Sequence, residues 1–124
     1  MQSFKEKTFY KLIVVALSIG LTAPVMARNI KIDVVRLESM ANEGNSFAQK
    51  MMGDMYSHTD LAKSFAWYEK AAKQNDTLSQ HNLGVMYENG TGVRQDYKMA
   101  KEWYGKACDN GEQSGCNNYR RLNN

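Results

Sequence analysis

Two cysteines and two histidines are the residues of this 124-residue chain whose types could support redox or metal chemistry. Cys108 and Cys116 make an even pair, which indicates one disulfide in an exported protein and two free thiols in a reducing compartment. His58 and His81 stand without a Cys-x-x-Cys pair, a His-x-x-x-His pair or a dense acidic cluster. We therefore expect no metal site, and nothing in the pattern indicates a cofactor.

Enzyme motifs built on serine or glycine are incomplete. The closest strings to the Ser-x-x-Lys motif of serine β-lactamases are Ser3-Phe4-Lys5 and Ala62-Lys63-Ser64, and neither fits. Gly90-Thr91-Gly92 has the look of a phosphate-binding loop, but it follows a helical pattern and lacks the third glycine. We interpret it as a turn that needs positive φ. The sequence therefore predicts no catalytic residue, and we expect that the protein is not an enzyme.

The N-terminus has the composition of a secretory signal peptide. Three lysines precede the apolar run Leu12–Leu21, and Val25 and Ala27 supply the small residues that a signal peptidase recognises. Ten apolar residues cover about 15 Å as a helix, which is about half of the hydrocarbon core of a bilayer. We predict a signal peptide over 1–27 and a periplasmic or secreted domain over 28–124, with no stable membrane span after cleavage. The alternative is an uncleaved anchor.

The charge of the mature part argues against two classes of partner. Residues 1–27 carry three lysines and one glutamate, so residues 28–124 hold 13 basic and 12 acidic side chains, a net charge of +1 instead of +3. No basic stripe remains that could neutralise phosphates or anionic lipids. We expect neither nucleic acid nor a membrane surface as the partner.

The mature part contains an internal repeat. Residues 47–56 align with 78–87 at an offset of 31, and residues 67–72 align with 103–108 at an offset of 36. A half copy precedes the first full copy, and a truncated copy follows the second. The two full copies and the truncated one cover about 46–76, 77–111 and 112–124.

Each copy has the pattern of two helices, which we call helix A and helix B. Helix A carries apolar residues at three- and four-residue spacing, and no alternating strand pattern occurs. Asp60 and Asp96 predict N-caps for the helices B. Pairs of a hydroxyl residue and a glutamine predict capping boxes for the helices A at Ser46–Gln49 and Thr77–Gln80. The predicted helices cover about 30–43, 46–57, 61–74, 78–89, 97–110 and 113–122.

Small residues recur where helices must approach each other. Gly53 and Gly84 lie inside helix A, where each costs about 1 kcal/mol relative to alanine, as expected if a Cβ would collide with a neighbouring helix. Ala71 and Ala107 hold matching positions in helix B, beside bulky Trp-Tyr pairs. One helical hairpin of this length cannot bury enough apolar surface, so the repeats must stack. We predict an all-α solenoid, an α/α superhelix of antiparallel helix pairs with two full repeats and half-repeat caps.

The second copy contains a long motif with many fixed spacings. Its residues are Leu83-Gly84, Tyr87, Gly90, Gly92-Val93, Asp96, Lys98, Trp103-Tyr104 and Lys106-Ala107. This motif resembles the Sel-one-like repeat family over about residues 40–122. It departs from the family pattern at Ser79, where the family has alanine, and at Met99, which shifts a small residue to Ala100. The first copy lacks the Gly-x-Gly-Val turn.

The resemblance implies a right-handed superhelix, similar to tetratricopeptide arrays, that binds other proteins. Exported bacterial members with cysteines bond a cysteine near the end of helix B to one in the next helix A, which implies a disulfide between Cys108 and Cys116. The predicted turn at Asn110-Gly111 is compatible with this pairing. The resemblance also implies two sharper functions. One is an immunity-type inhibitor of a toxin, and the alternative is a weak β-lactamase or penicillin-binding enzyme.

The family resemblance places the helices A along a concave binding face. We expect another protein or a peptide as the partner, and a plain solvated face is the alternative. The predicted binding residues are Lys50, Asp54, Ser57, His58, His81, Val85, Glu88, Asn89, Asn117 and Arg121.

Overall fold

In the computed structural model, residues 23–124 are described, and they form six α-helices without a strand among them. The all-α prediction is confirmed. The helices are α2 (Ala23–Asn42), α3 (Ser46–Tyr56), α4 (Leu61–Lys73), α5 (Thr77–Asn89), α6 (Tyr97–Asp109) and α7 (Gln113–Asn123).

The helix bounds agree with the sequence pattern everywhere except at the start. From α3 onward each observed end lies within one residue of its predicted position. The first helix begins at Ala23, earlier than the expected residue 30. The predicted signal peptide falls mainly on residues 1–22, which lie outside the described residues.

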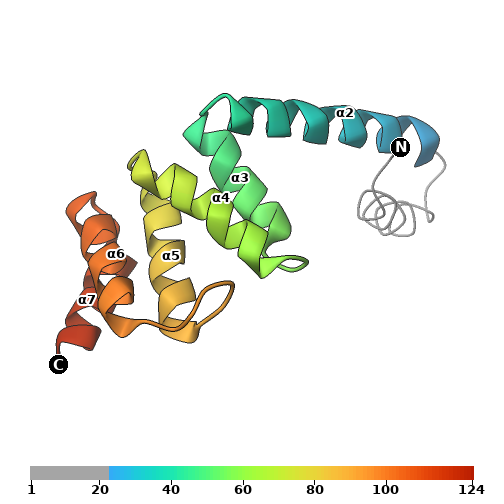
Figure 1. Cartoon of the computed structure of the whole chain (residues 1–124). Helices are drawn as coiled ribbons and strands as arrows, with labels where there is room; N and C mark the ends of the chain where they lie inside the picture. The colour runs from blue at the N-terminus through green and yellow to red at the C-terminus, as the bar shows by residue number, and fades with distance from the viewer. Residues whose placement is uncertain (1–22) are drawn as a thin grey trace. The chain divides into compact units, whose positions relative to one another are not determined.

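The repeats lie in the second of two compact units, Leu37–Asn124. Within this unit each helix from α3 to α7 packs against the next, and Figure 1 shows this for α5, α6 and α7. Helices α3, α5 and α7 are the helices A, and α4 and α6 are the helices B. The last residues of α2 act as half a helix B, because Ala41 and Leu37 pack with Ala48 and Met52 of α3.

The capping boxes predicted for the helices A are wrong. Asn45 caps α3 by accepting from the backbone N–H of Ala48 at 2.9 Å, and Asp76 caps α5 by accepting from that of Ser79 at 2.8 Å. Asparagine caps a helix about as well as serine, and aspartate caps better than threonine. Each precedes the hydroxyl residue, so Ser46 and Thr77 become the first helical residues.

The N-caps predicted for the helices B are confirmed. Asp60 accepts from the backbone N–H of Lys63 at 3.1 Å, and Asp96 accepts from that of Met99 at 3.0 Å. The Gly-x-Gly turn is also as expected, because Gly92 has φ 72°. A Cβ there would lie 2.2 Å from the carbonyl oxygen of Leu61, so the turn packs against the start of α4.

The helices of each repeat touch through a glycine and a tyrosine, as the spacing predicts. A Cβ on Gly53 would lie 2.5 Å from Cδ1 of Tyr68, and a Cβ on Gly84 would lie 2.5 Å from Cδ1 of Tyr104. Both tyrosines are buried. Each glycine therefore makes room for an aromatic ring of its own repeat's helix B.

A buried glutamine joins the repeats to each other. Gln80 of α5 is 1% exposed. Its Nε2 donates to the carbonyl oxygen of Ala72 in α4 at 3.2 Å and to Oδ1 of Asn75 at 3.3 Å, and its Oε1 accepts from Nδ2 of Asn110 at 2.8 Å. We call this set of bonds a glutamine clamp, because one side chain holds the ends of both helices B.

The clamp recurs at the other junctions, once with the same chemistry and once with different chemistry. Nε2 of Gln49 donates to the carbonyl oxygen of Ala41 at 3.0 Å, and its Oε1 accepts from Gln74 at 2.8 Å. At α7 the glutamine position is held by Cys116, which is bonded to Cys108 with a Cα–Cα distance of 4.5 Å. All three links join residues that are eight positions apart.

Candidate functional site

The predicted binding residues lie on or next to the helices A. We use the name A-helix surface for the exposed and partly exposed side chains of α3, α5 and α7. The structure brings several of the predicted residues together there through hydrogen bonds and ion pairs, and it leaves others at the edges.

In the first repeat, the carboxylate of Asp54 is the centre of the polar contacts. It accepts from Nζ of Lys50, one turn earlier in α3, at 2.7 Å, and from the hydroxyl of Tyr68 in α4 at 2.7 Å. Burial and the neighbouring Asp54 carboxylate both raise the pKa of Tyr68 above its usual range. Tyr68 therefore stays a neutral hydrogen-bond donor at physiological pH.

In the second repeat, Glu88 plays the corresponding part. Its carboxylate accepts from the hydroxyl of Tyr104 at 2.7 Å and pairs with Arg121 of α7 at 2.7 Å. Burial would raise the pKa of Glu88, but the hydrogen bonds from Tyr104 and Arg121 and the arginine charge outweigh it and lower that pKa. The carboxylate is therefore held in its charged form and links α5, α6 and α7.

The two carboxylates reach matching tyrosines from different repeat positions. Tyr68 and Tyr104 are equivalent at the offset of 36, but the position of Asp54 corresponds to Val85, and Glu88 lies one turn further along α5. An alignment of the repeats therefore does not reveal that Asp54 and Glu88 both accept a hydrogen bond from the equivalent tyrosine.

His81 of α5 lies between the second repeat and α7. Its Nε2 is 3.2 Å from Nδ2 of Asn118, and its ring centroid is 5.5 Å from that of Tyr104. The amide nitrogen of asparagine can only donate, so Nε2 of His81 is the acceptor in this contact. With Glu88 and Arg121, this contact makes α5 and α7 one continuous polar strip.

The remaining predicted residues make local contacts or none that bear on the polar strip. Ser57 donates to the backbone carbonyl of Asp54 at the end of α3. Oδ1 of Asn117 accepts from Gln113 and Arg120 within α7. The other three are partly or fully exposed: His58, Val85 and Asn89.

Sequence reasoning missed two apolar members of the A-helix surface. Phe47 and Leu78 are equivalent at the offset of 31, and their side chains are 64% and 54% exposed. Each lies three residues before a predicted polar member, Lys50 or His81, and so belongs to the same helix face. This three-residue spacing was the sequence signal that could have placed Phe47 and Leu78 on the surface. The surface therefore has an apolar end beside its polar strip.

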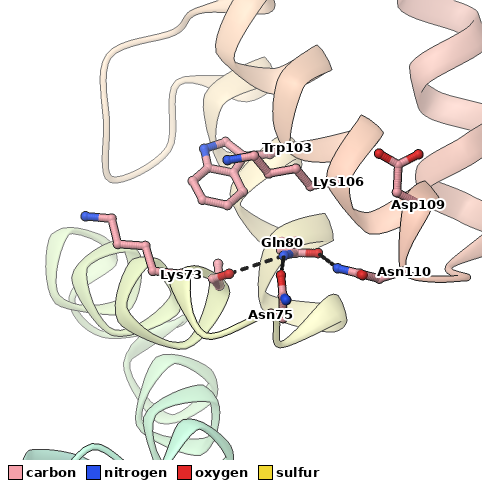
Figure 2. A pocket seen from close by; sticks show the side chains of 8 residues that line it. Lys73, Asn75, Gln80, Trp103, Lys106, Asp109 and Asn110 are labelled. Carbon is pink, nitrogen blue, oxygen red and sulfur yellow. Dashed lines mark hydrogen bonds between the residues drawn. The ribbon is translucent and has the colours of Figure 1, made fainter.

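A separate shallow pocket of about 380 Å³ lies where the helices B end. Figure 2 shows Gln80 between Asn75 and Asn110, with Trp103 and Lys106 beside them. Nζ of Lys106 lies 4.2 Å from the centroid of the Trp103 ring, a cation–π contact that the pattern did not predict. Its glutamine clamp binds other protein groups, so we assign the pocket a packing role.

The described part of the chain contains no group of three or more His, Cys, Asp or Glu side chains that could hold a metal ion. Within that same part, no helix is long and apolar enough to cross a bilayer. The carboxylates on the A-helix surface are bound by tyrosine, lysine or arginine, an arrangement suited to holding shape and to presenting hydrogen-bonding groups.

Comparison with known proteins assigns these repeats to a family. The Sel1 repeat pattern matches residues 46–76 and 77–112, which together make up more than half of the chain. The chain belongs to the Sel1 repeat family. Proteins of this family are typically non-catalytic interaction scaffolds, and the Sel1 repeat fold implies protein–protein interaction.

Solved Sel1 repeat structures share the fold. The cysteine-rich protein B of Helicobacter pylori is 25% identical, with a TM-score of 0.69 and 91% of each chain covered. A protective antigen of uropathogenic Escherichia coli is 37% identical, with a TM-score of 0.66, and the match covers 68% of this chain and 19% of the antigen.

Among curated Sel1 relatives, the HRD3 component of the ERAD-associated E3 ubiquitin-protein ligase of Candida glabrata is 31% identical over 72 residues, 57% of this chain and 9% of that protein. The chain spans between 9% and 18% of the length of the curated relatives that it matches first. The likeness therefore concerns the repeat and not the activity of those larger proteins.

Proposed function

We propose that this Sel1 repeat protein is an exported interaction module that binds another protein through its A-helix surface. One observation carries the proposal. The helices α3 and α5 present the same exposed pattern, a large apolar side chain (Phe47 or Leu78) followed by a polar group one turn later. Exposed apolar groups beside a polar strip are typical of protein-binding surfaces.

Export is supported by three features. The first 27 residues have the composition of a signal peptide. Cys108 and Cys116 are at disulfide-bonding distance, and such bonds persist in oxidising compartments. The cysteine-rich Helicobacter pylori protein is similar over 91% of the chain. Intact mass of the exported protein tests this: we expect Arg28 as the first residue, whereas retention of residues 1–27 would mean an anchor.

The proposal includes a sharper hypothesis, an immunity-type inhibitor that blocks an exported toxin. The predicted export of the chain favours it. It requires a stoichiometric complex with a toxin and loss of toxicity when the two are co-expressed. The alternative, a weak β-lactamase or penicillin-binding enzyme, has no support from the Sel1 relatives or from the serine motifs of the sequence.

Affinity capture from the extracytoplasmic fraction of the host tests the binding surface. The surface variant is Phe47→Ser with Leu78→Ser, and its matched control is Leu61→Ser with Tyr97→Ser. The control residues are also exposed, apolar and related by the repeat, but they begin the helices B. We expect a partner that wild type and control retain and the surface variant loses. Equal loss in both variants would contradict the proposal.

A further inference from the structure

The junction between α6 and α7 is the one Sel1 junction in the described chain that is made by redox-active atoms. Glutamine amides join α3 to Ala41 and α5 to Ala72, and these hydrogen bonds do not respond to a reductant. The disulfide between Cys108 and Cys116 holds the same position at α7. Reduction would therefore act on α7 alone.

Apart from this bond, α7 is held by packing against α6 in which few of its own residues are buried. It buries one residue, Gly115, whereas α3 buries four residues and α5 buries five. Gly115 lies against Ala107 and the backbone of α6, and Tyr119 of α7 stays 36% exposed. A helix with so little buried surface depends on its covalent tie. Both cysteines are partly exposed, so a thiol reductant can reach the bond.

The helix that the disulfide holds also completes the A-helix surface. Arg121 of α7 pairs with Glu88 at 2.7 Å, and Asn118 of α7 bonds to His81 at 3.2 Å. The side chain of Arg121 is 54% exposed, and ion pairs at such exposure contribute little to holding a helix. The polar strip therefore includes Arg121 and Asn118 only while α7 is packed against the rest of the domain.

We propose that the disulfide between Cys108 and Cys116 is a redox latch, whose reduction releases α7 and removes Arg121 and Asn118 from the A-helix surface. A thiolate of a dithiol reductant attacks one cysteine sulfur and forms a mixed disulfide, and the other cysteine leaves as a thiolate. The second thiol of the reductant then displaces the first cysteine. The protein disulfide gains two electrons and two protons, and the dithiol becomes a disulfide.

Release of α7 leaves Glu88 and His81 without their α7 partners and confines the surface to α3 and α5. The consequence for partner binding rests on the proposed function, but release of the helix does not. Release of α7 on reduction and partner binding to the A-helix surface can therefore be refuted separately. The test of the latch needs no partner.

Amide hydrogen exchange of the purified protein, with and without dithiothreitol, tests the latch, with thiol titration to show that reduction is complete. We expect the protection of the amides of α7 to fall by roughly one to two orders of magnitude on reduction, as the loss of a short disulfide loop implies, while α3 to α6 keep theirs. Unchanged protection of α7 after complete reduction would overturn the proposal. So would an equal loss across α3 to α6, because the release would not be local.

A matched variant carries the glutamine clamp into the last junction. Cys108→Ala with Cys116→Gln reproduces the alanine and glutamine that occupy these positions at the other two junctions. We expect exchange in this variant to be the same with and without dithiothreitol. A response to dithiothreitol equal to that of wild type would show that the reagent acts elsewhere, and would contradict the latch.

Discussion

The side-chain amide of Gln80 donates to the carbonyl oxygen of Ala72 at 3.2 Å, across the same eight-residue spacing that the Cys108–Cys116 bond spans one repeat later. Asn110 occupies the other end of the same glutamine side chain. The buried amide of Gln80 thus couples two repeats through hydrogen bonds to groups at the ends of α4 and α6. In this solenoid, such clamps hold neighbouring repeats together in addition to apolar packing.

Replacing the clamp residue should destabilise the fold. Gln80→Leu keeps the approximate size of the side chain but removes its hydrogen bonds to the carbonyl of Ala72 and to the side chains of Asn75 and Asn110. We expect a loss of about 1–3 kcal/mol in the free energy of unfolding, measured with urea. Gln113→Leu, an exposed glutamine in α7, is the control, and its effect should stay within about 0.5 kcal/mol. Equal effects of the two substitutions would show that the clamp contributes nothing.

The packing of α5 against α6 in the second repeat requires a residue without a side chain at Gly84. A Cβ at this position would meet the ring of Tyr104 at 2.5 Å, so Gly84→Ala forces the ring or the helix to move. We expect a net cost of about 1–3 kcal/mol despite the better helix propensity of alanine. A Cβ on Gly105 would be 3.2 Å from the partly exposed ring of Tyr119, which can shift. Thermal unfolding should therefore show Gly105→Ala to be neutral or stabilising, and the idea fails if it is the more harmful change.

The start of α5 distinguishes the observed cap from the predicted capping box. Because Asp76 accepts from the backbone N–H of Ser79, Asp76→Ala should cost about 1 kcal/mol. Thr77 is the first helical residue, and Thr77→Ala should change the free energy of unfolding by less than about 0.5 kcal/mol. Denaturant titration of both variants decides between them. If Thr77→Ala cost more stability than Asp76→Ala, the capping box would be the correct assignment.

The network around Glu88 gives stability a defined dependence on pH. Its folded pKa is lowered, so its contribution is present above the unfolded value, about 4.3, and is lost as the pH falls through the folded pKa. We expect Glu88→Gln to cost about 1 kcal/mol at pH 7, discounted for the exposure of Arg121, and progressively less below about pH 4. Urea unfolding of wild type and variant across this range measures it. A cost that is independent of pH would mean that the charge on Glu88 plays no part.

Most of the fold could be predicted from the sequence, because the same helix-packing and N-cap signals occur in both repeats. Gly53 and Gly84 predicted a close approach that the tyrosine contacts explain, and Asp60 and Asp96 predicted caps that the structure contains. The glutamines were assigned wrongly, because Ser-x-x-Gln and Thr-x-x-Gln spacings fit a capping box locally. Gln49 and Gln80 instead bind groups eight residues earlier and 25 or 30 residues later. Local patterns cannot report such distant partners.

The candidate site was less accessible to sequence reasoning. The polar row along the helices A could be listed from the repeat, but its contacts depend on tyrosines from the helices B and on the docking of α7. Phe47 and Leu78 were passed over because an apolar residue near a helix start resembles a core residue. Exposure, which only the packed structure gives, places them on the surface.

Site-specific photocrosslinking in the producing cell tests the central claim, that the A-helix surface is where another protein binds. A photoreactive phenylalanine analogue replaces Leu78 on the A-helix surface in one protein and Tyr97 at the start of α6 in the other, two positions that are 54% and 57% exposed. We predict one discrete crosslinked partner from position 78 and none from position 97. No crosslink at position 78, or the same partner with equal yield at both positions, would contradict the account.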